Sequence, residues 1–154
     1  MKKVTVVFAA ILVTACINQP TQKLQKQIKQ GISGQVIWLE GNLMPTIDQP
    51  DNTTRGGKPV VREIHVYKLI NVKETESLDG FFTKIKGSLV KKSFSDESGH
   101  FSIQLPVGEY SIFIKEEQGL YANLFDGSNN INPVVVNRDK VTEIKVKVDY
   151  KAVY

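Results

Sequence analysis

From residue 31 onward, apolar and polar residues alternate along the chain with a period of two. The alternation is clearest over residues 142–150, where Ile144, Val146, Val148 and Tyr150 share one face. Charged residues occupy the positions between them. This pattern is typical of a strand that has one face in a core and one in water, as in antiparallel sheets. We therefore predict a half-buried antiparallel strand here.

The same alternation predicts six further strands. They are expected at residues 34–39, 63–69, 89–94, 101–105, 110–115 and 132–136. Pro106 and Gly108 favour a turn, so the strands at 101–105 and 110–115 are expected to form a hairpin. No segment carries the apolar stripe of a helix of three turns. Short alternating strands separated by turns indicate an all-β fold, an antiparallel β-sandwich of about seven strands.

Two stretches interrupt this regular pattern. Residues 41–59 are rich in Pro, Gly and Asp and predict a long loop, a feature that is often functional. Residues 71–86 predict a second insertion, in which the pair Phe81 and Phe82 is expected to pack against the body of the domain.

The first thirty residues have a different composition. Lys2 and Lys3 precede a ten-residue apolar run, 4–13, broken only by Thr5. A run of this length falls short of the roughly 20 residues that span a bilayer but suits a secretory signal. Residues 17–30 are rich in Gln and Lys and predict a polar tether, with at most a short helix.

The apolar run ends in the sequence Val13-Thr14-Ala15-Cys16, which resembles the lipobox of bacterial lipoproteins. The resemblance implies cleavage between Ala15 and Cys16 and acylation of the Cys16 thiol. Two or more acyl chains hold a protein stably on a membrane. We therefore expect a cleaved signal over 1–15, a lipidated cysteine with its tether over 16–30, and one domain over 31–154. An ordinary signal peptide with a chance cysteine is the alternative.

Composition and charge narrow the classes of function. The formal net charge of +4 falls to +2 once Lys2 and Lys3 leave with the signal. A nucleic-acid partner is not expected, because its binding needs clustered basic residues. The lone Cys16 excludes an internal disulfide, and with only two histidines a structural zinc site is not expected. No cofactor is predicted.

Residues 95–112 carry a motif with regularly placed glycines and aromatics. It reads D-x-x-G-x-F-x-ϕ-x-L-P-x-G-x-Y-x-ϕ, where ϕ is apolar, and runs from Asp96 to Ile112. The motif resembles the carboxypeptidase regulatory-like (transthyretin-like, prealbumin-type) domain, and Gly34 sits in a run similar to that family's first strand. The resemblance implies a transthyretin-like or immunoglobulin-like sandwich over roughly 31–148, in small Bacteroidetes-type lipoproteins. It assigns no activity, because these are fold positions.

Catalysis is not expected. His65 and His100 are the candidates for acid–base chemistry, but nothing in the sequence joins either to a nucleophile, and no Gly-x-Ser-x-Gly motif occurs. The tail also lacks the pattern of the transthyretin-like hydrolase of a purine breakdown product. A hydrolase with an unrecognised site, with His65 as its best candidate, is kept as an alternative.

Loop residues offer candidates for ligand binding. Tyr121, Phe125 and Asp126 are expected to rim a partner site, and the aromatic set that might stack on sugars or peptides also includes Trp38, Phe81, Phe82 and Phe113. Calcium prefers clustered carboxylates and carbonyls. Asp126 stands alone among Gly, Ser and Asn, and Asp48 and Asp51 form a similarly weak set, so a plain turn is favoured over a metal site.

These observations predict a non-enzymatic, lipid-anchored protein of the cell envelope, with its β-sandwich acting as a binding or structural module. A carbohydrate- or peptide-binding accessory lipoprotein is the alternative. Ile17 replaces the Asp that resembles an inner-membrane retention signal, and no acidic run follows Cys16. The outer membrane is therefore expected, facing the periplasm rather than the cell surface. The expected partners are the membrane and an envelope protein or glycan.

Overall fold

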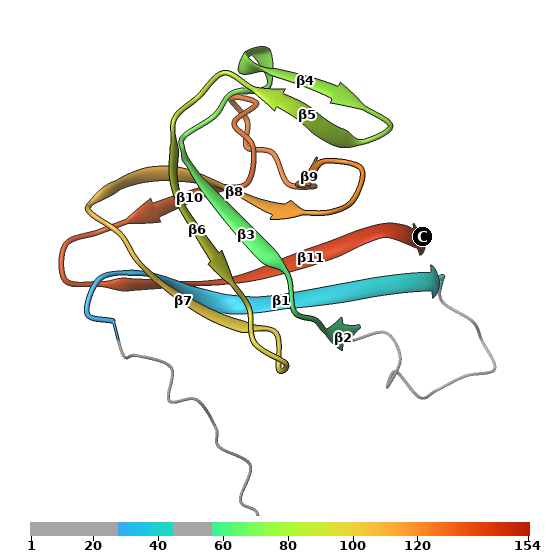
Figure 1. Ribbon diagram of the computed structural model, residues 1–154, viewed down its shortest axis with the longest axis horizontal. Helices are drawn as coiled ribbons and strands as arrows, with labels where there is room; N and C mark the ends of the chain where they lie inside the picture. The colour runs from blue at the N-terminus through green and yellow to red at the C-terminus, as the bar shows by residue number, and fades with distance from the viewer. Residues whose placement is uncertain (1–27, 45–56) are drawn as a thin grey trace, which may run out of the picture.

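The computed structural model describes residues 28–44 and 57–154, and their regular structure is almost entirely β. Eleven strands, some of only two residues, form two sheets that pack face to face (Figure 1). The all-β sandwich predicted from the alternating pattern is therefore confirmed. The structure has more strands than expected because short pieces, such as β2 (Lys58–Pro59) and β9 (Leu120–Tyr121), add to the sheets.

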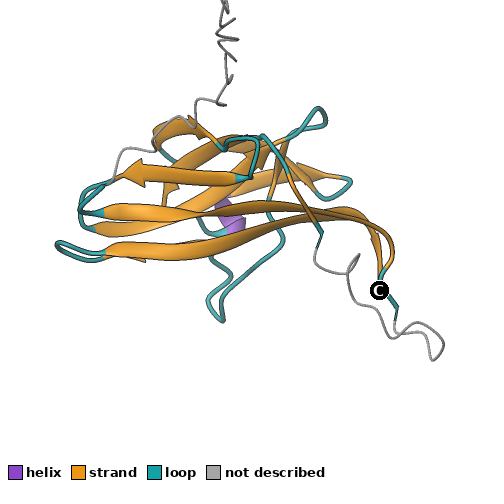
Figure 2. Ribbon diagram, turned by 90° about the horizontal axis from the view of Figure 1, so that it is seen from below, coloured by secondary structure: helices purple, strands orange, loops and turns teal. Residues whose placement is uncertain are grey.

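The first sheet, sheet A, is built around the long strand β1. Its members are β1 (Gly31–Asn42), β2 (Lys58–Pro59), β7 (His100–Gln104) and β11 (Val141–Val153). Strand β11 lies along one side of β1. On the other side of β1, β7 pairs with residues 31–35 and β2 pairs with Ile37 and Trp38. Figure 2 shows the long strands reaching beyond the rest of the sandwich toward the C-terminus.

Strand β11 pairs with β1 in parallel, so the antiparallel pairing expected for residues 142–150 is wrong. Gly31 faces Val141 and Trp38 faces Val148, with a register shift between Trp38 and Glu40. Alternation along a strand reports which face is buried and contains no information on the direction of its neighbour. The expected inward face is nevertheless correct, since Val146 and Val148 are buried.

The second sheet, sheet B, has seven strands in the order β4-β5-β9-β8-β3-β6, with β10 also beside β8. Their bounds are β3 (Glu63–Lys68), β4 (Thr75–Leu78), β5 (Phe81–Ile85), β6 (Leu89–Phe94), β8 (Gly108–Lys115), β9 (Leu120–Tyr121) and β10 (Pro133–Val136). All of its pairings are antiparallel.

The hairpin expected from residues 101–105 and 110–115 does not form, because β7 and β8 belong to different sheets. Strand β7 pairs with β1, and β8 pairs with β3. The turn between them carries the chain from one layer to the other. Tyr110 lies fully buried at this crossing and donates its hydroxyl proton to the carbonyl of Pro106 at 2.9 Å.

The main core lies between the two sheets and contains the apolar positions that the alternation predicted. Sheet A contributes Ile32, Phe101 and Ile103, and sheet B contributes Ile112 and Ile114, all at most 1% exposed. Full burial of each such side chain contributes about 1.5–3 kcal/mol to folding. This core is the main source of the sandwich's stability.

A second, smaller core lies on the opposite face of sheet B. Several of its residues directly follow a main-core residue along the chain, so their side chains point to the opposite face of the sheet. The buried members are Ile70, Phe82, Phe113, Ala122 and Ile131. The insertion predicted at 71–86 contains a 3-10 turn, η1 (Val72–Glu74), followed by the β4–β5 hairpin. Phe81 packs into the main core and Phe82 into the second, which confirms that this pair packs against the body.

The predicted loop at 41–59 is shorter at both ends than expected. Strand β1 continues to Asn42, and Lys58–Pro59 form β2, which pairs with Ile37 and Trp38. Residues 45–56 lie outside the described residues, as do the signal segment and the part of the tether before residue 28. The described residues include no helix long and apolar enough to cross a membrane.

Candidate functional site

The proposed lipidation site, Cys16, and the cleavage position at Ala15 lie outside the described residues. The structure does describe where the chain enters the domain. Gln30 donates from Nε2 to the carbonyl of Leu105 at 2.9 Å, and its Oε1 accepts from the amide of Asp139 at 3.0 Å. The end of the tether is thus fixed to the domain immediately before β1.

Tyr121 does not present the exposed ring that a stacking site requires. It is 7% exposed, and its ring packs against Phe81 and Tyr150 inside the sandwich. Its hydroxyl donates to Asp149 at 2.6 Å, and burial together with this carboxylate raises the pKa of Tyr121. Tyr121 was expected to rim a partner site, but alternation on the short strand β9 turns it into the core.

Phe125 and Asp126 are adjacent on the loop before β10, and neither takes part in the hydrogen bonds of the Tyr121 hydroxyl. Phe125 is 52% exposed. The Asp126 carboxylate accepts hydrogen bonds from the amides of Ser128 and Asn130 and from the side chain of Asn130, at 2.8–2.9 Å. These hydrogen bonds lower the pKa of Asp126, and the bond from the backbone amide of Asn130 makes the largest contribution. Both carboxylate oxygens therefore close a turn.

Metal-binding geometry is not present in the described part of the chain, where no three His, Cys, Asp or Glu side chains cluster. Asp48 and Asp51, the other acidic candidates, lie outside it.

The other aromatic candidates are mostly structural. Phe81, Phe82 and Phe113 are buried, and Trp38 is half-buried against Tyr150 at 5.1 Å between ring centroids. The Arg62 guanidinium lies 5.6 Å from the Trp38 ring centroid. Of the aromatics singled out from the sequence, Phe125 alone is exposed.

The two histidines lie on different sheets, since His65 is in β3 and His100 is in β7. Near His100, the Ser98 hydroxyl donates to Asp96 at 2.6 Å and lies 2.9 Å from Nδ1 of His100. The Ser98 hydroxyl and the amides of His100 and Ser98 hold the pKa of Asp96 below its usual range. A serine nucleophile needs a base that takes its proton. The amides of Ser98 and His100 both donate to Asp96 Oδ1 at 2.9 Å, so the Asp96 carboxylate closes this turn.

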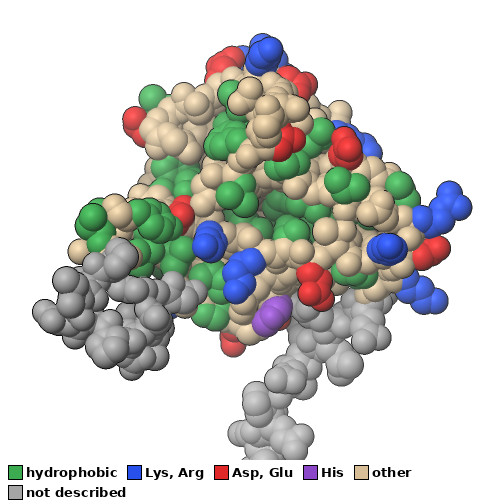
Figure 3. Space-filling view, turned by 180° about the vertical axis from the view of Figure 1, so that it is seen from behind, with side chains coloured by type: hydrophobic (Ala, Val, Ile, Leu, Met, Phe, Trp, Pro, Cys, Tyr) green, Lys and Arg blue, Asp and Glu red, His purple; other side chains and the backbone are tan. Residues whose placement is uncertain are grey.

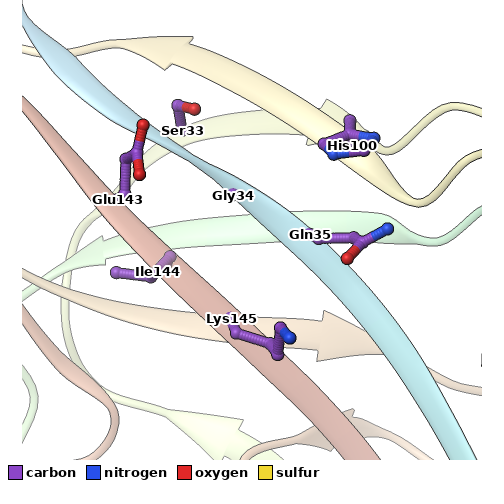
Figure 4. A pocket seen from close by; sticks show the side chains of 7 residues that line it. All are labelled: Ser33, Gly34, Gln35, His100, Glu143, Ile144 and Lys145. Carbon is purple, nitrogen blue, oxygen red and sulfur yellow. The ribbon is translucent and has the colours of Figure 1, made fainter. Parts of the chain in front are cut away.

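A hollow of about 340 Å³ lies on the face of sheet A that points away from the core. It is lined by residues of β1, β7 and β11: Ser33, Gly34, Gln35, His100, Glu143, Ile144 and Lys145 (Figure 4). Gln35 stands opposite His100 on one side and opposite Lys145 on the other, and Ser33 stands opposite Glu143. Side chains from three strands thus surround Gly34, which adds none.

The hollow combines hydrogen-bond donors and acceptors of both charge signs. Glu143 and Lys145 make no ion pair within the described residues, and Gln35 donates to the Ser98 carbonyl at 2.9 Å. Acidic and basic side chains are interspersed over the face shown in Figure 3. A hollow with polar groups of both charge signs set among apolar surface suits a ligand of low net charge that has both polar and apolar parts.

Sequence reasoning assigned Glu143 and Lys145 to a solvated strand face and did not find this hollow. The signal that could have found it is the pairing of β11 with β1, which brings residues 33–35 and 143–145 together. Comparisons with family models, curated proteins and solved structures find no match for this chain.

Proposed function

We propose that the chain is a lipid-anchored protein of the bacterial envelope, in which a non-enzymatic β-sandwich acts as a binding or structural module. The observation that carries the proposal is the lipobox-like Val13–Cys16 segment behind a ten-residue apolar run. Acylation of Cys16 and removal of residues 1–15 supply the anchor. An outer-membrane position, based on Ile17, and an orientation toward the periplasm, based on the lack of an acidic run after Cys16, are part of the same proposal.

The position of the domain relative to Cys16 supports this reading. Fourteen residues, 17–30, separate the cysteine from the first residue of β1, Gly31. A chain of that length reaches at most about 50 Å when fully extended. This reach lets the sandwich stand clear of the membrane surface while Cys16 remains in it.

We further propose that the domain is of the carboxypeptidase regulatory-like type. Two features of the motif support it. Gly99 has a positive φ of 74°, in a turn where its amide donates to the carbonyl of Asp96. Tyr110 is tied to Pro106 where the chain passes between the sheets. This type of domain implies a fold and leaves the ligand open.

The anchoring proposal is tested by replacing the acylated residue. Cys16→Ser should abolish labelling with palmitate and release the protein from the membrane fraction, while Asn18→Ser in the adjacent tether should behave as wild type. If Cys16→Ser still labels and still sediments with membranes, the lipoprotein proposal fails.

A second candidate function, glycan or peptide binding, is favoured by the hollow on sheet A. Its donors and acceptors match the hydroxyl and amide groups of those ligands. A glycan array and a cell-wall pulldown should show binding that Lys145→Ala weakens. Lys147→Ala is the matched control, because Lys147 follows on the same strand face and does not line the hollow. Absence of binding at millimolar ligand, or equal loss in both variants, would contradict this function.

A further inference from the structure

A second hollow, of about 200 Å³, lies on the outer face of sheet B beside the smaller core. It is lined by residues of β3, β5, β8 and β9 and of the turn before β9: His65, Tyr67, Phe82, Thr83, Lys84, Ile85, Lys115, Gly119 and Leu120. Five of these side chains are aromatic or aliphatic, and none of the lining residues is acidic. The hollow therefore joins an apolar surface to positive charge.

The two lysines of the hollow differ in their partners. Lys84 donates to the carboxylate of Glu76 at 2.8 Å, and this bond raises the pKa of the lysine. Lys115 is exposed and makes no hydrogen bond or ion pair among the described residues. Lys115 is thus the cation that remains available to a ligand.

The acid nearest to the hollow along β3 is already engaged. Glu63 Oε1 lies 2.9 Å from Nε2 of His65 and 3.3 Å from Nζ of Lys92. The His65 hydrogen bond lowers the pKa of Glu63 ahead of the contribution of Lys92. Because the Glu63 carboxylate can only accept, the hydrogen bond to His65 places a proton on Nε2 of that ring. The negative charge of Glu63 is thus shared between His65 and Lys92. Glu63 makes no ion pair with Lys115 among the described residues.

His65 lines this hollow with a ring that is mostly buried. The residue is 7% exposed, and its Nδ1 atom is buried without a hydrogen-bond partner among the described residues. Because Nδ1 has almost no accessible surface, it is not a contact for a ligand in the hollow. The accessible part of the ring adds to the apolar lining and reports on binding.

We propose that this hollow binds a small carboxylate carried on an apolar group, with the carboxylate on Lys115 and the apolar group against Tyr67, Phe82 and Leu120. A free aromatic acid and a peptide ending in phenylalanine share this chemistry. The inference rests on the proposed role as a binding module and is independent of the lipid anchor. Loss of acylation and loss of this binding are therefore separate outcomes of separate experiments.

The test is a titration of the full chain followed by nuclear magnetic resonance, reading the His65 ring and the Leu120 methyl groups. Benzoate and N-acetyl-Gly-Phe are the probes, and benzyl alcohol is the uncharged control. Saturable shifts in the millimolar range are expected with at least one acid. Benzyl alcohol should bind at least about tenfold more weakly, which corresponds to 1.4 kcal/mol.

Lys115→Gln should lower the affinity for the same acid by about tenfold, while Lys147→Gln on the other sheet should leave this affinity unchanged. Both lysines are exposed, so both variants are expected to fold, as an unchanged spectrum of the main core would show. Stronger binding of benzoate indicates a free acid, and stronger binding of the peptide indicates a chain terminus. No saturable shift with either acid, or equal affinity in wild type and Lys115→Gln, would overturn the proposal.

Discussion

Gly34 shows how one residue without a side chain allows three strands to meet. A Cβ at this position would lie 2.0 Å from the carbonyl oxygen of Ile144 on β11 and 3.0 Å from the Phe101 ring on β7. Real Cβ atoms do not approach backbone oxygens this closely, so a larger residue must push β1 and β11 apart. The glycine in the family-like first-strand motif is therefore explained by packing.

Gly34→Ala is expected to lower the free energy of unfolding by about 3 kcal/mol, measured by urea denaturation. Gly127→Ala is the matched control, because no atom lies within 4 Å of the Cβ it would add. That variant should stay within about 0.5 kcal/mol of wild type. Equal losses in the two variants would contradict the close approach at Gly34.

Asp149 collects three hydrogen bonds near the C-terminus. Tyr121 and Asn123 donate to one carboxylate oxygen, and Tyr154 donates to the other, at 2.6–2.7 Å. Burial raises the pKa of Asp149, whereas these hydrogen bonds together lower it by more than burial raises it. The net shift of the pKa is therefore downward. Because the folded pKa lies below the unfolded one, this stabilisation is present above the unfolded pKa and is lost as pH falls through the folded pKa.

We therefore expect Asp149→Asn to lower the free energy of unfolding by about 1–3 kcal/mol at neutral pH. The variant should also show a shallower loss of stability than wild type below about pH 4. Urea titrations at a series of pH values measure both effects. Identical pH dependence in the two proteins would show that Asp149 does not contribute.

The individual strands illustrate which parts of the fold the sequence could predict. Alternation correctly assigned the buried faces of β7 and β11, since it reports the environment of each side chain. For β8 it found the face of Tyr110, Ile112 and Ile114 but missed that Ser111 and Phe113 on the other face are buried as well. It could not reveal that β7 and β8 lie in different sheets or that β11 runs parallel to β1, because those facts depend on contacts between distant segments. The sheet-A hollow was missed for the same reason, as it exists only where β1, β7 and β11 meet.

Tyr110 marks the crossing that replaces the expected β7–β8 hairpin. Tyr110→Phe should cost about 1 kcal/mol of unfolding free energy, since the Pro106 carbonyl loses its donor. Tyr67→Phe is the control, because the Tyr67 hydroxyl makes no hydrogen bond among the described residues. A larger loss in Tyr67→Phe than in Tyr110→Phe, by thermal or urea unfolding, would contradict this role.

Across the whole molecule, Glu116 ties the two sheets together. It follows β8 of sheet B, accepts from Arg62 Nε at 2.7 Å, and accepts from the hydroxyl of Tyr150 on β11 at 3.0 Å. Glu116 is 8% exposed, whereas the side chain of Arg62 is 30% exposed. Removing the buried partner leaves the arginine partly desolvated and the tyrosine hydroxyl without its acceptor.

Glu116→Ala is therefore expected to lower the free energy of unfolding by about 3 kcal/mol. The adjacent Glu117→Ala should have little effect, because Glu117 is exposed and makes no ion pair within the described residues. Calorimetry of the two variants measures the difference. Comparable melting temperatures would show that the tie between the sheets is weak.

In the whole molecule as we propose it, the sandwich that begins at Gly31 is held at the membrane by an acylated Cys16. This proposal is tested most directly by the intact mass and the N-terminal peptide of the chain purified from bacterial membranes. We expect a protein that lacks residues 1–15 and carries a diacylglyceryl group on the Cys16 sulfur. A mature chain with an unmodified Cys16, or with its N-terminus at another residue, would contradict it.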